Sequence, residues 1–452
     1  MTALPSSFLQ LLSRMGRSSN DIIAYEQSFR QSLPKSGFPL TARCGSQWHS
    51  FFPGRQRQQG PFQLPNSRYI ERDDRTIPLG LTWQHKYGLW YSQEYAASIP
   101  AQILPVKKGD RILDMCASPG GKTIQILNRL HECGGGEIIA NEPDRQRLTV
   151  LRDSLLRIGL PHRFLLSKLG QAITNDDIGG YVDSIILDAP CSGEGTAFKS
   201  QSALLFWRRE DINNIVGLQK QLITNALSLL KPGGRLVYST CTINPYENEG
   251  IVDWMIQTYG DQLSLESLSL PNTDPGCLSW GEESDGRTSY ADRCIRCLPH
   301  RHGTGGFFVA LWRKNNTHLY TQKPLPAGGH KHDTALTELF AYFGYQGAKP
   351  DHLLSIDDII AYGYSAHSSI PLAKKVHTHY IPLHGFAQLY GHACTDHCID
   401  IDNHRYQELV TTGRTDNREG YQGRYILRRA GCGLTVVKCV GGDMKGKLPQ
   451  RK

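Results

Sequence analysis

The feature that most constrains the fold is an alternation of short apolar segments with amphipathic helical patterns, which runs from about residue 99 to residue 312. A connection between parallel strands needs a dozen or more residues to return to the same end of the sheet, and it usually contains a helix. The alternation therefore predicts an α/β fold with a mostly parallel sheet covered by crossover helices.

The expected elements follow one another along this region. Segments with the apolar pattern of buried strands are Arg111–Met115, Glu137–Ala140, Arg163–Leu166, Val182–Leu187, Arg235–Ser239 and Phe307–Trp312. Segments with helical spacing are Lys122–Leu130, Leu148–Ile158 and Ile215–Leu230. The last helix should end at Pro232, Gly233 and Gly234, which favour a break. We interpret the polar, turn-rich stretch Gln262–Arg287 as a connection.

The length of 452 residues predicts more than one folded unit. Residues 1–97 form an expected N-terminal RNA-binding module, with helical spacing that includes Phe8 and Leu12 and an irregular stretch over Gly45–Asn66. Residues 98–316 form the α/β unit. The Pro-, Gly- and His-rich stretch Lys323–His332 predicts a linker, and residues 335–452 should form a small β-rich domain with strands near Tyr425–Leu427 and Thr435–Lys438.

Composition and charge fit a soluble protein with a polyanionic partner. The chain contains 39 % apolar and 20 % charged residues and has a net charge of +8. No run of about 18 apolar residues is present that would predict a membrane span, and the first residues do not have the pattern of an export signal. We therefore expect a cytoplasmic protein in which the 12 cysteines are reduced thiols.

The segment DMCASPGGKT, Asp114–Thr123, lies where a strand should end and a helix begin. Its glycines allow a ligand to approach the backbone, and the start of the helix offers free N–H groups. Glu142 follows the next strand, where an acid can accept both hydroxyls of a ribose. Because the segment does not contain the glycine spacing of a phosphate-binding loop, the pattern favours a nucleoside cofactor over a nucleoside triphosphate.

Two cysteines should lie beyond the ends of two successive strands. Cys191 is in LDAPCSGEGT, Leu187–Thr196, and Cys241 is in YSTCTINPYENE, Tyr238–Glu249. A lone cysteine is most often a buried, inert thiol. Two cysteines at the carboxyl edge of one parallel sheet instead favour a shared pocket in which a thiolate acts as a nucleophile.

Together these motifs resemble the RNA cytosine-5 methyltransferases, a family that contains bacterial ribosomal RNA enzymes and the eukaryotic NOL1/NOP2/Sun proteins. The resemblance extends upstream to YSQEYAASIPAQIL and downstream to LPHRHGTGGFFVALW, so that it covers about residues 90–314. It implies a Rossmann-like core that uses S-adenosylmethionine. The cofactor-binding residues that it implies are Cys116, Ala117, Ser118, Pro119, Gly120, Gly121, Lys122, Glu142 and Asp188.

The resemblance also implies a mechanism. Cys241 would add to C6 of cytosine and make C5 nucleophilic, and Cys191 would assist loss of the C5 proton and release of the product. Asp188 would hold or protonate the ring at N3, which offsets the charge that develops on attack, with Lys122 as a nearby polar partner. The base would have to leave its stack for this chemistry, so the substrate would be a flipped or single-stranded cytosine.

The chain departs from the family pattern at two places. After the third strand, where the family usually has an aspartate that recognises adenine, this chain has Ser167–Gly170 without an acid; Asp176 or Asp177 could substitute only if their loop folds back. After Gly195, Lys199 is the only residue that matches the charge that the family has there.

The end of the chain is similar to the small β-rich, PUA-like RNA-binding module of RsmF-type ribosomal RNA methyltransferases. The alternative is a solvated basic tail. The basic residues that would contact phosphates are Arg424, Arg428, Arg429, Lys438, Lys445, Lys447, Arg451 and Lys452.

Other sites are less favoured by the sequence. Cys294–His302 and His392–Cys398 contain metal-ligating residue types, but neither has the full spacing of a zinc site, and no metal is expected. Phe307 and Phe308 continue into an apolar strand, which favours core positions over a base-stacking role.

The resulting hypothesis is cytosine-5 methylation of structured RNA by a monomer, with ribosomal RNA as the leading substrate. Transfer RNA methylation and a non-catalytic RNA-binding role in ribosome assembly are the alternatives. DNA cytosine methylation is disfavoured because it uses only the cysteine after the fourth strand. Amino-group methylation is disfavoured because Asn244-Pro245-Tyr246 follows the wrong strand and contains only one proline.

Overall fold

The computed structural model describes residues 5–446 except for 16, 29–32, 45–48, 50–54, 57–59, 72–77, 161–163, 200–206, 278–289, 316–338, 340, 345, 347–372, 377–378, 383–385, 388–390, 392–393 and 430–431. The expected linker Lys323–His332 and the last basic residues from Lys447 onward lie outside the described residues. No helix in the described part of the chain is long and apolar enough to cross a membrane.

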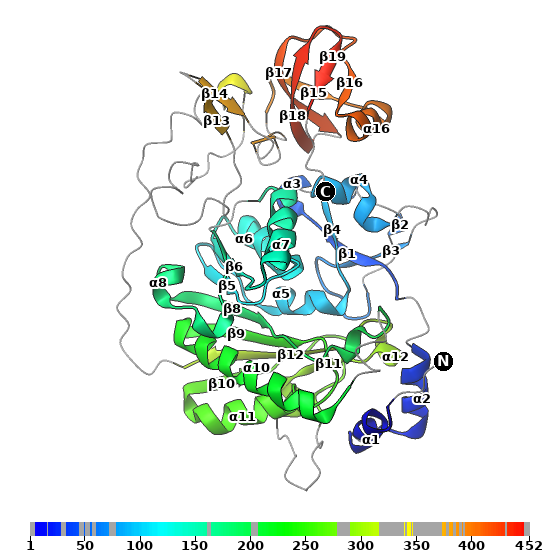
Figure 1. The fold of residues 1–452 in the computed structure, drawn as a ribbon, viewed down its shortest axis with the longest axis vertical. Helices are drawn as coiled ribbons and strands as arrows, with labels where there is room; N and C mark the ends of the chain where they lie inside the picture. The colour runs from blue at the N-terminus through cyan, green and yellow to red at the C-terminus, as the bar shows by residue number, and fades with distance from the viewer. Residues whose placement is uncertain are drawn as a thin grey trace.

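An eight-stranded sheet forms the centre of the chain (Figure 1). Its strand order is β10-β12-β9-β8-β5-β6-β7, and β11 pairs with β12. β9, β8, β5, β6 and β7 are parallel to one another, whereas β12 is antiparallel to β9, β10 and β11. The strands are β5 (Arg111–Asp114), β6 (Glu137–Asn141), β7 (Phe164–Leu166), β8 (Val182–Asp188), β9 (Leu230–Thr240), β10 (Leu263–Glu266), β11 (Ile295–Cys297) and β12 (Phe307–Lys314).

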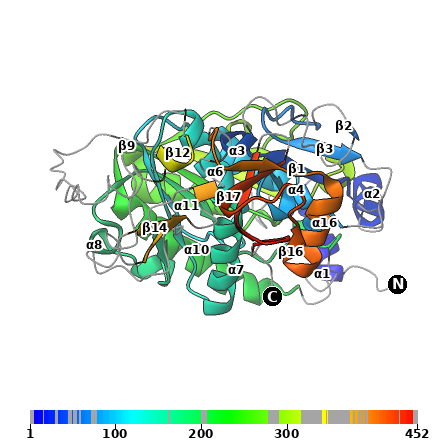
Figure 2. The ribbon, with the colours of Figure 1, turned by 90° about the horizontal axis from the view of Figure 1, so that it is seen from above.

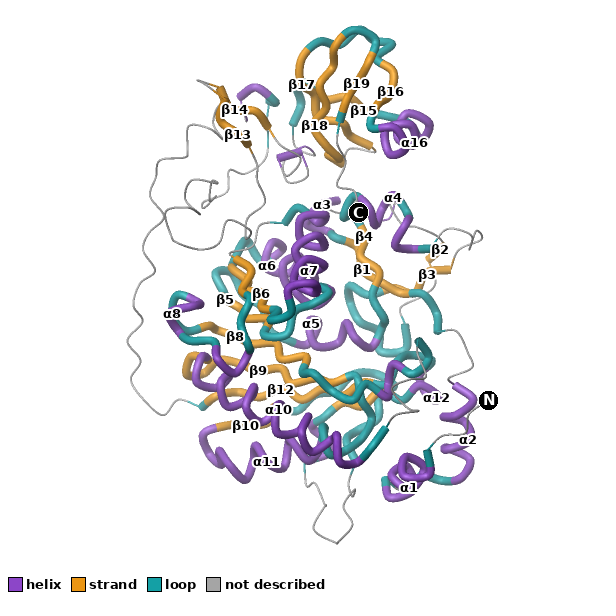
Figure 3. Tube along the Cα trace, in the orientation of Figure 1, coloured by secondary structure: helices purple, strands orange, loops and turns teal. Residues whose placement is uncertain are grey.

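Helices cover both faces of this sheet (Figure 3). One face packs against α5 (Ile99–Ile103), α6 (Gly121–Glu132) and α7 (Arg145–Ile158). The other face packs against α8 (Asn175–Ile178), α10 (Arg209–Leu229) and α11 (Glu249–Tyr259). Each strand alternates its side chains between the two cores, so that Ile112 and Val237 belong to the first and Leu113 and Leu236 to the second. This three-layer α/β architecture confirms the predicted fold class.

The end of α10 differs from the prediction. Helical spacing predicted that Leu230 belongs to the helix, but α10 ends at Leu229, and Leu230 begins β9 and pairs with Val182. Lys314 Nζ donates hydrogen bonds to the carbonyl oxygens of Leu227 and Leu230, at 2.8 and 2.9 Å, and so satisfies groups that would otherwise be open at the helix end. The Pro232-Gly233-Gly234 segment therefore lies within the bounds of β9.

The stretch interpreted as a connection also contains an element that the sequence analysis missed. Leu263–Glu266 forms the edge strand β10, because Leu263 and Leu265 alternate with Ser264 and pack into the core beside β12. A strand this short, with only two apolar residues, has too weak a pattern to be predicted alone.

The N-terminal region combines two helices with a second sheet. The helices α1 (Ser6–Arg14) and α2 (Ser19–Ser28) are followed by a four-stranded sheet in the order β2-β3-β1-β4. Its strands are β1 (Ser36–Pro39), β2 (Arg55–Gln56), β3 (Arg68–Glu71) and β4 (Trp90–Ser92), and short helices are α3 (Thr41–Cys44) and α4 (Trp83–Lys86). Phe38, Leu64 and Tyr95 of this region belong to the same core cluster as α6 and α7. This shared core does not separate residues 1–97 from the α/β unit, so a domain boundary near residue 97 stays a prediction.

Helix α12 (Pro299–His302), which precedes β12, anchors α2 to the central sheet. Asp21 of α2 accepts from Arg301 at 3.1 Å and lies 3.3 Å from His300 Nε2. The two N-terminal helices thereby pack over the loop that follows β9, where Ile243 shares a core cluster with Phe8 and Tyr25.

The C-terminal region forms a small β-rich unit, as predicted. Five strands pair in the order β15-β17-β18-β19-β16, and α16 (Asn403–Thr412) precedes β16. The strands are β15 (Cys398–Asp400), β16 (Arg414–Asp416), β17 (Gly423–Arg429), β18 (Cys432–Val440) and β19 (Asp443–Lys445); a separate hairpin consists of β13 (Ala373–Val376) and β14 (His379–Pro382). Seen from above, this unit overlies the N-terminal sheet and α7 (Figure 2).

One buried arginine joins three parts of the chain. Arg43, which is 2 % exposed, donates to the carbonyl oxygens of Ile158 at the end of α7, Tyr87 and Gly433 of β18. Cys44, Tyr87 and Leu89 share a core cluster with the C-terminal strands. The C-terminal unit is therefore packed against the N-terminal region through buried apolar and polar contacts.

Candidate active site

The carboxyl ends of β5, β6, β8 and β9 lie along one edge of the central sheet, because these strands are parallel neighbours. The chain order reverses between β5 and β8, since β6 and β7 extend the sheet on one side of β5 and β8 and β9 on the other. Open α/β sheets bind their ligands at such a point of reversal. The residues selected from the sequence lie in the loops that follow these four strands.

The turn after β5 presents backbone at the start of α6. Cys116, Ala117, Ser118, Pro119 and Gly120 form the turn, and Gly121 and Lys122 are the first residues of α6. Ala117 N–H donates to the Asn141 carbonyl at the end of β6, at 2.9 Å. Gly120 has a φ of +106°, and a Cβ there would approach Leu151 Cδ1 to 3.1 Å. The glycine thus allows a conformation that side chains rarely adopt.

Glu142 follows β6 and is only 2 % exposed. Its carboxylate accepts a hydrogen bond from Asp144 N–H at 3.0 Å and lies 3.4 Å from Arg147 Nη2. Arg147 also donates to the carbonyl of Ser118, at 3.2 Å, and therefore connects the turn after β5 with the acid after β6. A carboxylate beside a glycine turn, without a phosphate-binding loop, has the donor and acceptor groups that fit a nucleoside.

Lys122 and Asp188 form an ion pair beside this turn. Lys122 Nζ lies 2.7 Å from Asp188 Oδ2, and Asp188 Oδ1 accepts from Ser239 Oγ of β9 at 2.7 Å. Burial opposes the charge of Lys122, but Asp188 outweighs this effect and raises the pKa of the ammonium. Both oxygens of Asp188 are thereby oriented, and Lys122 is held as a cation.

The two cysteine sulfurs converge. Cys191 Sγ lies 3.4 Å from Cys241 Sγ, and both residues are partly exposed. The hydrogen bond with Cys241 and burial raise the pKa of Cys191 well above its ordinary value. A negative charge on Cys241 also raises the pKa of Lys122, so the ammonium and this sulfur interact electrostatically. The sulfur pair therefore lies near a cation, and burial and the second sulfur favour the protonated form of Cys191.

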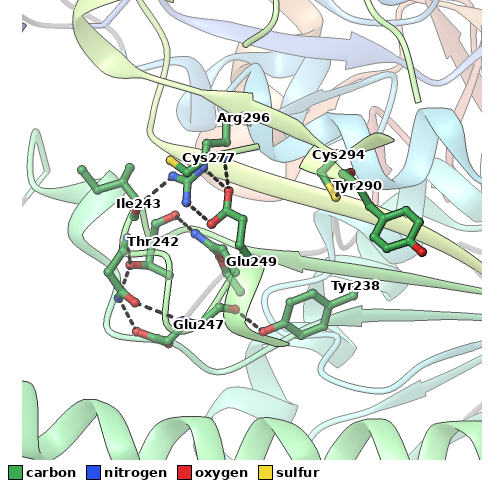
Figure 4. Close-up of polar contacts among 12 residues, drawn as sticks. Tyr238, Thr242, Ile243, Glu247, Glu249, Cys277, Tyr290, Cys294 and Arg296 are labelled. Atoms are coloured by element: carbon green, nitrogen blue, oxygen red, sulfur yellow. Dashed lines mark hydrogen bonds and ion pairs between the residues drawn. The ribbon is translucent and has the colours of Figure 1, made fainter. Parts of the chain in front are cut away.

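The loop after β9 contains a network of buried polar side chains, part of which is drawn in Figure 4. Tyr238 donates to the Glu247 carbonyl at 2.6 Å, and the Glu247 carboxylate accepts from Ser192, Asn244 and Gln219. Two residues further on, Glu249 accepts from Arg296 Nε at 2.7 Å, and both side chains are completely buried. The loop after β9 is thus held by two neighbouring glutamates with different partners.

Glu194 adds a second carboxyl group to this network. Its Oε1 accepts from Asn244 Nδ2, at 3.0 Å, and from Trp207 Nε1. Burial, together with the nearby Glu247, raises the pKa of Glu194 to about 7. Burial also raises the pKa of Glu247. The donors to Glu194 that these hydrogen bonds identify are neutral groups, which do not offset the loss of hydration of a carboxylate.

Lys168 lies in the Ser167–Gly170 stretch after β7, which contains no acid. Its backbone exchanges hydrogen bonds with the side chain of Asn141, and its Nζ lies 2.7 Å from Asp177. Asp177 also caps α8 by accepting from Thr174. The loop therefore does bring Asp177 back towards the end of β7, but its carboxylate is engaged by Lys168 and Thr174.

The remaining candidates lie within the core. Phe307 and Phe308 are 3 % and 0 % exposed, which confirms their prediction as core residues, and Lys122 Nζ lies 5.3 Å from the centre of the Phe307 ring. Cys294 and Cys297 belong to the cores on opposite faces of the sheet, so they cannot share a metal. In the described ranges no group of three or more His, Cys, Asp or Glu side chains could hold a metal ion.

Comparison with known proteins assigns the family. Residues 101–313 match the family model described as 16S rRNA methyltransferase RsmB/F. The ribosomal RNA small subunit methyltransferase F of Aeromonas salmonicida is 32% identical over 416 residues, which are 84% of this chain and 82% of that protein. The chain belongs to the RsmB/F family of ribosomal RNA methyltransferases. The protein of the same name from Erwinia tasmaniensis is 37% identical over 267 residues, 58% of this chain and 52% of that protein.

Solved structures agree with the family in their fold. A methyltransferase homologue from Pyrococcus horikoshii is 28% identical and has a TM-score of 0.55, covering 69% of this chain and 100% of that one. NSun6 from the same organism has a TM-score of 0.57 at 22% identity, over 69% of this chain and 99% of that one, and this likeness concerns the fold alone.

Four residues at this RsmB/F-family site were not selected from the sequence: Ser239, Arg147, Gln219 and Glu247. Ser239 was the easiest of the four to predict, because it lies two residues before Cys241 on a predicted strand and could be expected at the same edge of the sheet. Arg147 follows Glu142 by about one helical turn. Gln219 is in the middle of α10, and its contact with Glu247 depends on how that helix packs.

Proposed function

We propose that this member of the RsmB/F family methylates C5 of a cytosine in RNA, with ribosomal RNA as the substrate class, through a covalent bond between Cys241 and C6. The observation that carries the proposal is the 3.4 Å separation of the Cys191 and Cys241 sulfurs beside the Lys122–Asp188 pair. The names of the bacterial relatives support the substrate class. Because bacterial ribosomes are made in the cytoplasm, we also expect the protein to act there.

The covalent step overcomes the low reactivity of cytosine C5. The Cys241 thiolate forms a bond to C6, and the electrons of the C5–C6 double bond move onto C5 and N3. Asp188, oriented by Lys122 and Ser239, would hold a proton against N3 of the ring, and this proton and the Lys122 ammonium would offset the negative charge that develops. C5 is then the nucleophilic atom.

The methyl group comes from the nucleoside side of the site. Bound S-adenosylmethionine supplies a methyl group that is electrophilic because it is attached to a sulfonium. Glu142 would bind the ribose hydroxyls, and the Cys116–Lys122 segment would offer its backbone to the rest of the cofactor. The fit of this group rests on the buried carboxylate of Glu142 and on the start of α6, where no side chain caps the backbone N–H groups.

Product release requires loss of the C5 proton. Once Cys241 is bonded to carbon, it no longer carries the charge that stabilises the proton of Cys191, so Cys191 becomes more acidic and loses its proton to solvent. The Cys191 thiolate then accepts the proton from C5. The electrons of that C–H bond restore the C5–C6 double bond, and those of the C6–sulfur bond return to Cys241. The two cysteines thus end with the proton that they had at the start.

The C-terminal sheet offers a surface for the RNA backbone. Arg424 is paired in register with Lys438, Lys438 with Lys445, and Lys445 with Arg414, so four cations form one row across β17, β18, β19 and β16. Adjacent strands lie about 4.8 Å apart, which gives the row a length of about 14 Å. Asp443 lies 3.5 Å from Lys445 and 3.7 Å from Arg414 and partly neutralises this end. The row is suited to phosphates and does not read sequence.

Methyl transfer from labelled S-adenosylmethionine to ribosomal RNA tests the proposal. Cys241→Ala should abolish transfer, whereas Cys191→Ala should trap a denaturation-resistant RNA adduct that carries the labelled methyl group on C5 of the attached base. Transfer RNA and DNA of the same length serve as competing substrates. Equal activity of the wild type and both variants, or methylation at a position other than C5, would overturn the mechanism.

A further inference from the structure

Glu247 holds both chain neighbours of Cys191. Ser192 N–H approaches the two carboxylate oxygens at 3.3 and 3.2 Å, and Ser192 Oγ donates to Oε1. Gln219 Nε2 donates to Glu247 Oε2 at 2.8 Å and to the carbonyl of Pro190 at 2.9 Å. The residues before and after Cys191 are therefore fixed by one buried carboxylate and one buried amide.

The same glutamate belongs to the loop that carries Cys241. Asn244 Nδ2 donates to Glu247 Oε1 at 2.6 Å, and Glu247 N–H donates to Asn244 Oδ1 at 3.1 Å. Tyr238 of β9 donates to the carbonyl of Glu247 at 2.6 Å. Glu247 thus connects the turn after β8 with the turn after β9, although it is not next to either cysteine in the chain.

The residue type suits this connection. Four donor groups converge on the carboxylate: Ser192 N–H, Ser192 Oγ, Asn244 Nδ2 and Gln219 Nε2. A carboxylate offers about four acceptor positions on two oxygens, so it can satisfy all of them. A glutamine of the same shape would turn an NH₂ group towards at least one donor, and the two turns would lose part of their connection.

We propose that Glu247 is a positioning residue for the release step, which holds the Cys191 sulfur at C5 of the base while Cys241 is bonded to C6. This inference rests on the proposed function, because it concerns the second half of that reaction. Methyl transfer needs Cys241, Lys122 and Asp188, and among the described contacts none of these side chains has a hydrogen bond with the Glu247 carboxylate. Loss of Glu247 should therefore affect release more than transfer.

Glu247→Gln provides the test. We expect single-turnover methyl transfer to remain close to wild type, whereas multiple turnover falls on the order of 10- to 100-fold because Cys191 is displaced. A denaturation-resistant RNA adduct should accumulate in this variant even though Cys191 is present. A purely structural role would instead lower transfer and adduct formation together.

Glu249→Gln is the matched control. Glu249 is as deeply buried as Glu247 and lies two residues away, but its partners are Arg296 and Cys277 N–H and not the Cys191 turn. Glu249→Gln should have a lower thermal midpoint than wild type but should not accumulate the adduct. Both variants, Glu247→Gln and Glu249→Gln, are assayed at a temperature at which circular dichroism shows them folded. Equal accumulation of adduct in both variants would overturn the inference.

Ser192→Ala offers a smaller change that keeps the carboxylate. It should also accumulate adduct, and the double variant with Glu247→Gln should accumulate no more than Glu247→Gln alone, since both changes remove the same connection. If Cys191→Ala traps the adduct but Glu247→Gln turns over normally, this inference fails and the proposed function stands. If Cys191→Ala traps no adduct, both fail.

Discussion

The carboxyl groups behind the cysteine turns and those around Arg405 in the C-terminal sheet have opposite pKa shifts. Burial raises the pKa of Glu194 to about 7, with only neutral donors identified around it by hydrogen bonds. Hydrogen bonds from Arg405 lower the pKa of Asp416 and Glu419, which are solvent-accessible. The comparison shows that the partner of a carboxyl group and its access to water decide the sign together, whatever the residue type.

Glu249 combines the two environments, because it is both buried and paired with a guanidinium. Arg296 donates to it through Nε at 2.7 Å and through Nη2 at 2.5 Å, and Arg296 Nη1 also donates to the Ile243 carbonyl. The buried ion pair therefore depends on both partners. Removing one of them leaves a charge without compensation in the core.

The largest expected effect comes from breaking this pair. Arg296→Met should lower the free energy of unfolding by about 3–5 kcal/mol, because Glu249 is left as an unpaired buried charge. Urea unfolding followed by circular dichroism measures the change. The double variant with Glu249→Leu should recover part of the loss, and a single-variant effect below about 1 kcal/mol would contradict the argument.

Glu194→Gln should change how stability depends on pH. The pKa of Glu194 is about 7 in the folded chain and 4.5 ordinarily, so its contribution to stability is present below pH 4.5 and is lost as pH rises to about 7. The variant does not have this loss. As pH rises between these values, the free energy of unfolding of Glu194→Gln should increase relative to that of wild type by on the order of 2–3 kcal/mol. Urea unfolding at each pH measures this difference.

Glu247 is present in both proteins, and burial raises its pKa as well. Because the two carboxyl groups act on each other, the measured difference includes the response of Glu247 to the loss of the Glu194 charge. A difference between the two proteins that does not change over this pH window would show that Glu194 is ionised with little penalty.

Removing charges from the basic row should weaken RNA binding in steps. For each of Lys438 and Lys445 changed to Gln, the slope of log affinity against log salt should become shallower by about 0.7–0.9. The loss should be the same for unrelated RNA sequences, because phosphate contacts carry no sequence information. Filter binding of the full chain at several salt concentrations measures it. A loss confined to one sequence would indicate base contacts.

The smallest expected effect concerns Arg405→Gln. Asp416 and Glu419 have lowered pKa values in the folded chain, so their contribution to stability is present above their ordinary values of 3.8 and 4.5 and is lost as pH falls through the folded values. The variant should therefore be less stable than wild type at neutral pH, and the difference should shrink in acid. Thermal midpoints between pH 3 and 7 test this. A difference in thermal midpoint that becomes larger as the pH falls would contradict the lowered pKa values of Asp416 and Glu419.

The parallel part of the central sheet could be predicted from the sequence more fully than its antiparallel edge. The parallel strands and the loops that carry Cys191, Cys241, Lys122 and Glu142 were predicted because apolar alternation and glycine turns are local patterns. The edge strands β10 and β11 were not, since each is short and takes its position from pairing with β12. The same holds for Leu230, which its pairing with Val182 assigns to β9 although its spacing is helical.

The sequence by itself determined which strand ends carry reactive side chains, because parallel strands direct their carboxyl ends to one edge of a sheet. Only the tertiary structure decided that the two sulfurs are 3.4 Å apart and that Glu247 fixes the turn around Cys191. These contacts join residues about 50 positions apart. Their geometry depends on the register of β8 against β9 and on the packing of α10, which no local pattern encodes.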